Sequence, residues 1–176
     1  AAGCADTATL ILTINNSPQS SDTSSNWNGF GVRCNGDTDG WIDLTVTGGV
    51  PGVPPYTYLW TGPSGYNSQQ DSISGLGAGT YSVTATDDNG CTTSETVVIT
   101  EPILLTSSTD SSYFNGFGVR CNGYTDGWID VSVFNGVDTL PYTYSWVVSN
   151  GGDLGGNAAN VEDLDSLVAG TYTCTV

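Results

Sequence analysis

Residues 28–43 read NGFGVRCNGDTDGWID, and residues 115–130 read NGFGVRCNGYTDGWID. Within this stretch only Asp37 changes, to Tyr124, and the two copies begin 87 residues apart. Further along, residues 79–81 (GTY) return 91 positions later as residues 170–172, so the second copy carries about four extra residues. A repeat of this length indicates a tandem array of similar structural units.

Each copy consists of short alternating apolar and polar runs between turn residues. Residues 41–46, 56–60, 80–86 and 96–100 alternate with a period of two, and Gly, Pro and Asn residues lie between them. No segment has a sustained helical period. We therefore predict an all-β protein made of tandem immunoglobulin-like β-sandwich domains in an extended array or filament.

Aromatic residues at matched positions support the sandwich prediction. Tyr81 and Tyr172 follow an Ala-Gly-Thr turn and are predicted to form tyrosine corners, in which the hydroxyl bonds nearby backbone. Trp60 and Trp146 follow Pro-Tyr-Thr-Tyr and are expected to fill the cores.

The repeats divide the chain into five segments. Residues 1–18 match the last strand of the first repeat, so they are predicted to be the last strand of a preceding domain or of a neighbouring subunit. Residues 19–31 are predicted to be a linker with an aromatic plug, 32–101 the first repeat, 102–118 a second linker, and 119–176 a second repeat without its last strand. Phe30 and Phe117 would dock at the domain interface, although the Ser-rich stretches before them also fit a flexible linker.

Cysteines occur at repeated positions. Cys34 opens a predicted repeat, and Cys91 starts the predicted last strand, so a disulfide between them is expected where both strands would begin. Pairing Cys91 with Cys121 would need cysteines about one domain length apart, well beyond the Cα separation that a disulfide allows. Cys4 and Cys121 are then expected to have partners outside this chain or in a neighbouring copy, and disulfides imply an extracellular setting.

Two accounts fit the match between residues 3–14 and residues 90–101. The chain is either a window of a longer polymer of repeats, or a subunit whose residues 10–14 insert into the next subunit as a complementing strand.

Composition excludes several classes of function. The net charge is −16, with two basic residues and no His, which excludes nucleic acid as a natural partner. The same charge argues against docking on anionic lipid, and no apolar run reaches the length of a membrane span. No constellation for acid–base, nucleophilic or zinc chemistry is visible, so an enzyme is not predicted.

The motifs together resemble the SprB-type repeat. The resemblance rests on Cys-Asn-Gly, Asp-Gly-Trp-Ile-Asp, Pro-Tyr-Thr-Tyr-x-Trp and Ala-Gly-Thr-Tyr, and it covers most of residues 34–101 and 121–176. Such repeats occur in tandem in large cell-surface adhesins of Bacteroidota, including gliding-motility adhesins. The resemblance implies surface adhesion or fibre building.

Several residues are candidates for binding or modification. The carboxylates around the Gly-rich turn suggest a calcium site, although structural turn residues are the competing interpretation. Arg33 and Arg120, the two cations, are expected to pair nearby carboxylates and stabilise the domain junction, with a ligand contact as the alternative. Asp-Ser/Thr-apolar motifs, which resemble the O-glycosylation motif of Bacteroidota, predict a glycoprotein. The calcium candidates are Asp37, Asp39, Asp43, Asp126 and Asp130, and the glycosylation candidates are Thr7, Ser72, Thr139 and Ser166.

These patterns predict a secreted, extracellular structural or adhesive protein that forms a cell-surface fibre. Its expected partners are copies of itself or flanking repeats, and no cofactor is expected apart from the candidate calcium. The alternative is an array that binds surface polysaccharide through exposed aromatic residues such as Tyr66 and Tyr124.

Overall fold

The computed structural model describes residues 9–12, 16–50, 56–137 and 141–176. The chain forms two compact units, Ala1–Glu101 (unit 1) and Pro102–Val176 (unit 2). Within the described residues the regular structure is twelve β-strands and one 3-10 turn, Pro63–Gly65, which confirms the all-β prediction. No helix in this part of the chain has the length and apolar character needed to cross a bilayer.

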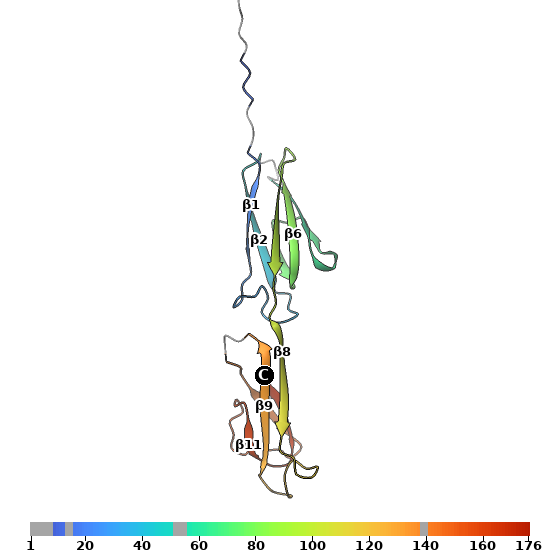
Figure 1. The fold of residues 1–176 in the computed structure, drawn as a ribbon, viewed down its shortest axis with the longest axis vertical. Coiled ribbons are helices and arrows are strands. Elements are labelled where there is room, and N and C mark those ends of the chain that lie inside the picture. Colours follow the sequence, from blue (N-terminus) through green and yellow to red (C-terminus); the bar gives the residue numbers. More distant parts are fainter. Residues whose placement is uncertain (1–8, 13–15, 51–55, 138–140) are drawn as a thin grey trace, which may run out of the picture. The chain divides into compact units, whose positions relative to one another are not determined.

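Unit 1 is a sandwich of two antiparallel sheets (Figure 1). Its strands are β1 (Gln19–Ser24), β2 (Gly40–Thr47), β3 (Thr57–Thr61), β4 (Asn67–Ser68), β5 (Ser72–Leu76), β6 (Gly79–Thr86) and β7 (Thr92–Ile99). One sheet has the order β1-β2-β5 and the other has the order β4-β3-β6-β7. The first, second and fifth strands face the third, sixth and seventh, which is the immunoglobulin arrangement.

The core of unit 1 lies between these sheets. Alternate residues of β2 and β6 are buried, because successive side chains of a strand point to opposite faces. Trp60 and Ile42 are completely buried, and Trp60 donates its indole N–H to the Gln70 carbonyl at 2.8 Å. The buried cluster also contains Leu44, Ile73, Leu76, Tyr81, Val83, Val97 and Ile99.

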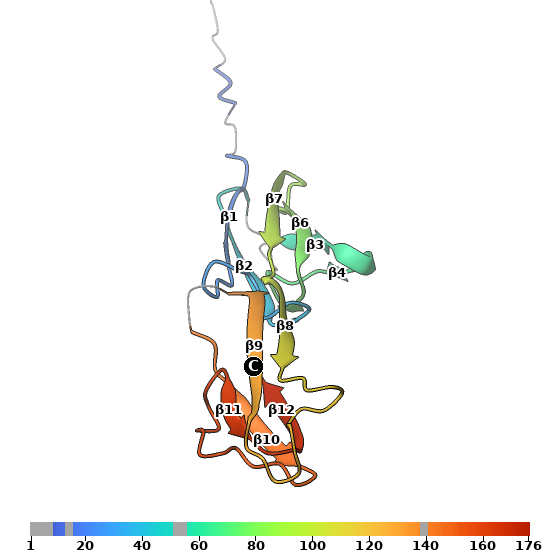
Figure 2. The same ribbon diagram turned by 60° about the horizontal axis from the view of Figure 1, so that its bottom comes forward.

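Unit 2 repeats this pattern with five strands. They are β8 (Ile103–Ser111), β9 (Gly127–Gly136), β10 (Ser145–Ser149), β11 (Leu164–Leu167) and β12 (Thr171–Thr175). The sheets have the orders β11-β9-β8 and β10-β12, as the rotated view shows (Figure 2). Strand β7 of unit 1 has no counterpart among the described residues of unit 2, so β12 pairs with β10 alone.

The two predicted linkers contain strands. β1 pairs with β2 over six residues, and β8 pairs with β9 over most of its length, so each is the first strand of its sandwich. β1 consists of polar residues, among them Ser and Asp, and has no apolar alternation, but its pairing with the central strand β2 makes it a strand. Of residues 1–18, predicted to be a strand, positions 9–12 and 16–18 are described and none is in a strand.

The predicted Cys34–Cys91 disulfide is wrong. Cys34 lies in the loop after β1, where the neighbouring Gly36 N–H binds the Glu101 carboxylate, just past the end of β7. Cys91 lies at the other end of β7, where its carbonyl accepts the Asp87 N–H. Eight residues of strand span roughly 26 Å, whereas disulfide-bonded Cα atoms lie within about 7 Å. Both thiols are free and exposed. Because β1 is the first strand of the sandwich and precedes Cys34, Cys34 lies at the end of the sandwich opposite to Cys91.

Candidate functional site

The repeated Asn-Gly-Phe-Gly element forms a tight hairpin rather than a linker. Asn28 and Gly29 both have positive φ angles, of 52° and 94°, as a two-residue type I′ hairpin turn requires. Trp27 and Phe30 exchange backbone hydrogen bonds of 2.6 and 3.1 Å across the turn. Unit 2 repeats the bridge between Phe114 and Phe117. Phe30 is half-buried and Phe117 is 70% exposed, and their docking at a domain interface stays a prediction.

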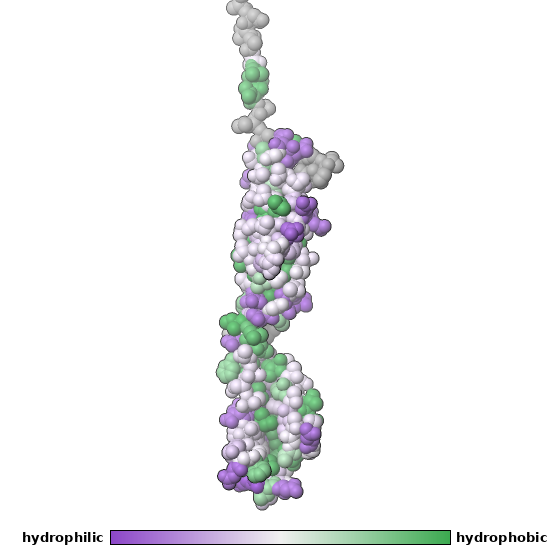
Figure 3. All heavy atoms as spheres, turned by 90° about the vertical axis from the view of Figure 1, so that its right-hand side faces the viewer, coloured by the Kyte–Doolittle hydropathy of each residue, from purple (hydrophilic) through white to green (hydrophobic). Residues whose placement is uncertain are grey.

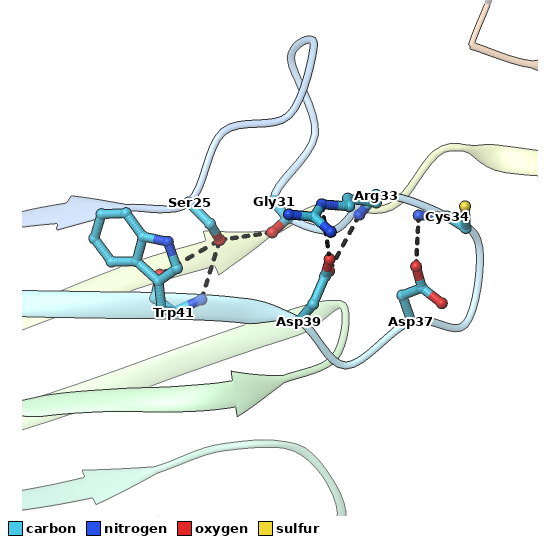
Figure 4. A network of polar contacts seen from close by, with 7 residues as sticks. All are labelled: Ser25, Gly31, Arg33, Cys34, Asp37, Asp39 and Trp41. Atoms are coloured by element: carbon cyan, nitrogen blue, oxygen red, sulfur yellow. Dashed lines mark hydrogen bonds and ion pairs between the residues drawn. The ribbon is translucent and has the colours of Figure 1, made fainter.

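A buried serine, which no sequence motif had singled out, holds this hairpin against β2. The Ser25 hydroxyl donates to the Gly31 carbonyl at 2.6 Å and accepts from the Trp41 N–H at 3.1 Å (Figure 4). Ser112 makes the same two bonds in unit 2, to Gly118 and Trp128. The signal was available, because Ser25 and Ser112 are separated by the repeat interval within otherwise variable Ser-rich segments.

The two arginines make local contacts. Arg33 Nε lies 3.4 Å from Asp39 Oδ2, and the guanidinium stacks over Trp27 at 4.1 Å from the ring centroid. Arg120 repeats the arrangement with Asp126 and Phe114, at 3.5 and 5.0 Å. The predicted carboxylate partners are therefore present. The Arg33 side chain is 62% exposed, however, so this is a surface ion pair rather than a partly buried one.

The five candidate calcium ligands are not brought together. The carboxylate of Asp39 accepts the backbone N–H of Arg33, and that of Asp37 accepts the backbone N–H of Cys34 at 3.1 Å. The carboxylate of Asp43 accepts a hydrogen bond from the Ser72 hydroxyl at 2.6 Å. In unit 2, Asp126 accepts the Arg120 N–H, and Asp130 lies in β9 opposite Asp110. Among the described residues no group of three acidic, His or Cys side chains is placed to hold a metal. The calcium prediction therefore rests on the sequence alone.

Tyr81 and Tyr172 make the hydrogen bond of a tyrosine corner. Tyr81 donates its hydroxyl to the Gly77 carbonyl at 3.1 Å, and Tyr172 donates to the Val168 carbonyl at 2.9 Å. Burial raises the pKa of Tyr81, because the charged phenolate is disfavoured there. Trp146 is 6% exposed and donates its indole N–H to the Val161 carbonyl. Tyr66 packs edge-to-face on Tyr81, with ring centroids 5.5 Å apart, so it supports the core of unit 1.

Asp87 organises the turn between β6 and β7. Its buried carboxylate accepts the N–H groups of Val50, Asn89 and Cys91, at 3.0, 3.0 and 2.8 Å. These bonds, that from Val50 foremost, lower the pKa of Asp87. Nothing in the sequence distinguished this carboxylate from the other acidic residues.

Two of the four predicted glycosylation sites can be located. Ser72 is exposed and donates to Asp43, and Ser166 is exposed with a positive φ angle of 55° in β11. Thr7 and Thr139 lie outside the described residues, as does Cys4.

The main difference between the units is an open groove in unit 2. A cavity of about 250 Å³ adjoins Gly118, Gly127 and Leu167, and another of about 200 Å³ is lined by Thr109, Cys174 and other residues. The cavities share three lining residues, Ser111, Ile129 and Tyr172, so they form one groove between β8 and β12. In Figure 3 apolar atoms run in a strip along the face of unit 2.

Strand β7 fills the same groove in unit 1. It pairs with β6 over eight residues, and Ser20 of β1 contacts it through Thr93 and Glu95, at 2.8 and 3.0 Å. The absence of this strand changes burial in unit 2. Val32, Ile42 and Val83 are 0 to 2% exposed, whereas their counterparts Val119, Ile129 and Cys174 are only half-buried. Burial still raises the pKa of the Cys174 thiol.

A segment that resembles β7 in sequence is exposed elsewhere in the chain. Residues 9–12 read TLIL and occupy the repeat positions of residues 96–99, TVVI. Leu10, Ile11 and Leu12 are 84, 79 and 85% exposed, and they form the apolar patch on the N-terminal segment in Figure 3. The counterparts of Leu10 and Leu12, which are Val97 and Ile99, are 7 and 2% exposed.

Comparison with known proteins confirms the family resemblance. The family model described as SprB repeat matches residues 32–65 and 119–152, so the chain carries two SprB-type repeats. A solved structure of three N-terminal domains of the bacteriophage RB49 Highly Immunogenic Outer Capsid protein (Hoc) is 20% identical, with a TM-score of 0.38. That match covers 90% of this chain and 52% of Hoc's, so the chain spans about half of that structure. No curated protein matches the chain.

The SprB repeats place the chain among surface repeat proteins of the adhesion type.

Proposed function

We propose that this chain is an extracellular structural and adhesive protein that forms a cell-surface fibre, and that successive copies are joined by strand complementation. The observation that carries the proposal is that residues 9–12, which resemble β7, are exposed, while the described residues of unit 2 include no counterpart of β7. An inserted strand gains main-chain hydrogen bonds along its whole length, and its alternate side chains enter pockets.

Energetics favour occupation of the groove. Within the described residues β12 pairs with β10 alone, so its other edge is open to a strand that can reach it, and such edges promote association. Burial of two alternate apolar side chains, Leu10 and Leu12, would add a hydrophobic driving force of about 25 cal/mol for each Å² removed from water. One contact would therefore cover both the exposed segment and the exposed edge.

The composition suits a secreted fibre. A net charge of −16 on 176 residues keeps copies soluble and opposes unspecific association. Backbone pairing and apolar contacts, which do not depend on opposite charges, can join copies of the same sign.

Polysaccharide binding is a second candidate, favoured by exposed aromatic rings in unit 2. Tyr113, Phe117 and Tyr124 are 77, 70 and 51% exposed, and Tyr113, Phe117 and Arg120 border one surface hollow. Aromatic faces flanked by polar groups suit the apolar faces of sugar rings. A glycan array with the wild-type chain and the Tyr124→Ala and Phe117→Ala variants tests this candidate, which requires binding that at least one substitution removes.

Assembly of the purified chain tests the fibre proposal. We expect the full chain to form elongated polymers, seen by negative-stain electron microscopy and sedimentation, and a chain without residues 1–14 to stay as single copies. Circular dichroism with a β-sheet spectrum serves as the folding control for the truncated chain. A full chain that stays monomeric at high concentration, or a truncated chain that polymerises equally well, would contradict the proposal.

The mass of the reduced, denatured polypeptide from native material distinguishes the two ways of building a fibre. A mass near 18.2 kDa, or modestly above it with glycans, supports separate subunits joined by strands. A mass of hundreds of kilodaltons supports repeats joined in one polypeptide and contradicts strand exchange between copies.

A further inference from the structure

Unit 1 supplies a template for how the groove of unit 2 is filled. In unit 1, β6 and β7 pair in a single antiparallel register from Gly79↔Ile99 to Thr86↔Thr92. Residues 170–176 occupy the repeat positions of residues 79–85, and residues 9–12 occupy those of residues 96–99. Transferring the register therefore pairs Leu12 with Gly170 and Leu10 with Tyr172.

The glycine-lined part of the groove suits the side chain of Leu12. In unit 1 the corresponding side chain, Ile99, lies against two glycines, and a β-carbon on Gly31 or Gly40 would come within 2.8 or 3.2 Å of Ile99 Cγ2. The counterparts of these glycines, Gly118 and Gly127, line the cavity of about 250 Å³ in unit 2. The glycines thus leave room for one branched apolar side chain.

Backbone donors lie beside this cavity. The N–H groups of Gly31 and Val32 both bind the Thr100 carbonyl, at 2.8 and 3.1 Å, immediately after Ile99. In unit 2 the corresponding groups belong to Gly118 and Val119. Gly31 and Val32 are buried under β7, whereas Gly118 is exposed and Val119 is half-buried. A strand in the transferred register would bring a carbonyl to these groups.

The periodicity of a strand excludes a shift by one residue. In the transferred register Leu10 and Leu12 face the groove, while Thr9 and Ile11 face solvent, as do their counterparts Thr96 and Val98. A slip by one residue would put Thr9 in the groove and Leu10 in water, because alternate side chains exchange faces. A slip by two would leave the glycine-lined cavity without Leu12.

We propose that residues 9–12 of a second copy of this chain insert antiparallel to β12 of unit 2, with Leu12 in the cavity beside Gly118 and Gly127, Leu10 against Tyr172, and Thr9 directly opposite Thr173. This inference rests on the proposed function and specifies its partner and register. The groove thereby selects a strand by the position of its apolar residues.

Disulfide trapping tests the register. In unit 1 the counterparts of Thr9 and Thr173 are Thr96 and Ser82, whose side-chain oxygens lie 3.2 Å apart on the solvent face. Cα atoms of directly opposed residues in an antiparallel pair lie about 4.5–5.5 Å apart, within the range of a disulfide. The variant Thr9→Cys/Thr173→Cys is made with Cys4, Cys34, Cys91 and Cys121 changed to Ser and Cys174 changed to Val, the residue at position 83.

Mild oxidation with copper phenanthroline should convert most of this variant into a ladder of covalent oligomers on a non-reducing denaturing gel. The matched control, Thr9→Cys/Thr175→Cys, shifts one cysteine by two residues on the same face and should give at least tenfold less cross-linked product. Polymers that form without the Thr9–Thr173 cross-link, or that cross-link more through position 175, overturn the register but leave the fibre proposal standing. A chain that forms no polymer fails both proposals.

Alkylation of the native Cys174 gives a second test that needs no substitution in the chain. Cys174 lines the groove, so its alkylation by iodoacetamide should slow at least tenfold when the wild-type chain polymerises. Equal alkylation rates in monomer and polymer would show that the groove stays open, and would overturn the inference. Protection of Cys174 without formation of the Thr9–Thr173 cross-link would mean that other residues fill the groove, such as residues that follow Val176 in a longer polypeptide, and would overturn the inference.

Discussion

Replacing Leu12 by alanine is expected to weaken the association between copies about 30-fold, whereas replacing its neighbour Ile11 has little effect. Leu12 is 85% exposed in the free segment, and its counterpart Ile99 is 2% exposed in unit 1. Insertion would therefore remove nearly the whole side chain from water, which contributes about 1.5–3 kcal/mol for a leucine. A loss of about 2 kcal/mol corresponds to a roughly 30-fold weaker affinity.

Ile11 is the matched control for this measurement. It is 79% exposed, and its counterpart Val98 remains 60% exposed on the outer face of β7. Only about a fifth of its surface would become buried, so Ile11→Ala should cost about 0.5 kcal/mol, or roughly twofold in affinity. Sedimentation velocity over a concentration series measures both constants. Equal losses for the two variants, or a larger loss for Ile11→Ala, would refute the inserted-strand geometry.

Three further predictions concern unit 1. Hydrogen bonds to the carboxylate hold the folded-state pKa of Asp87 below its unfolded value, so their stabilisation is present above about pH 4 and is lost as the pH falls toward the folded pKa. Denaturant unfolding between pH 6 and 2 should therefore show a shallower acid decline for Asp87→Asn, and parallel declines would contradict this role. Peptide mapping after oxidation should find no peptide that joins Cys34 to Cys91 within one unit; such a peptide would disprove the strand order. The exposed Arg33→Ala substitution should lower the free energy of unfolding by only about 1 kcal/mol, since surface ion pairs and exposed cation–π contacts are weak, and a loss above about 2 kcal/mol would contradict the exposed geometry.

The features that sequence analysis predicted correctly are local or repeated. Alternation within residues 41–46 and 80–86 revealed strands, because a half-buried strand shows its two faces in its own sequence. Trp60 and Trp146 were predicted to be core residues from their repeated Pro-Tyr-Thr-Tyr setting, and both are buried.

The features that it missed depend on distant partners. β1 is polar throughout, and only its pairing with β2 makes it a strand. Because β1 was predicted to be a linker, Cys34 was predicted to lie at the same end of the sandwich as Cys91. Each additional strand reverses the direction of the chain, so the two cysteines lie at opposite ends and the predicted disulfide was wrong. Asp87 lacked a signal of its own, and Ser25 had only its recurrence at the repeat interval, since each acts through backbone groups that the fold brings to it.

The sequence by itself determined the two-fold repeat, the all-β class and the two SprB-type repeats, because these depend on residue order and period. It also contained the likeness between residues 9–12 and β7. Only the tertiary structure decided that unit 2 has a groove with the shape of that strand, that Gly118 and Gly127 lie along it, and that Leu10 and Leu12 are unburied. Burial and free sheet edges arise from segments far apart in the chain, so they are properties of the assembled sheets and not of any single stretch.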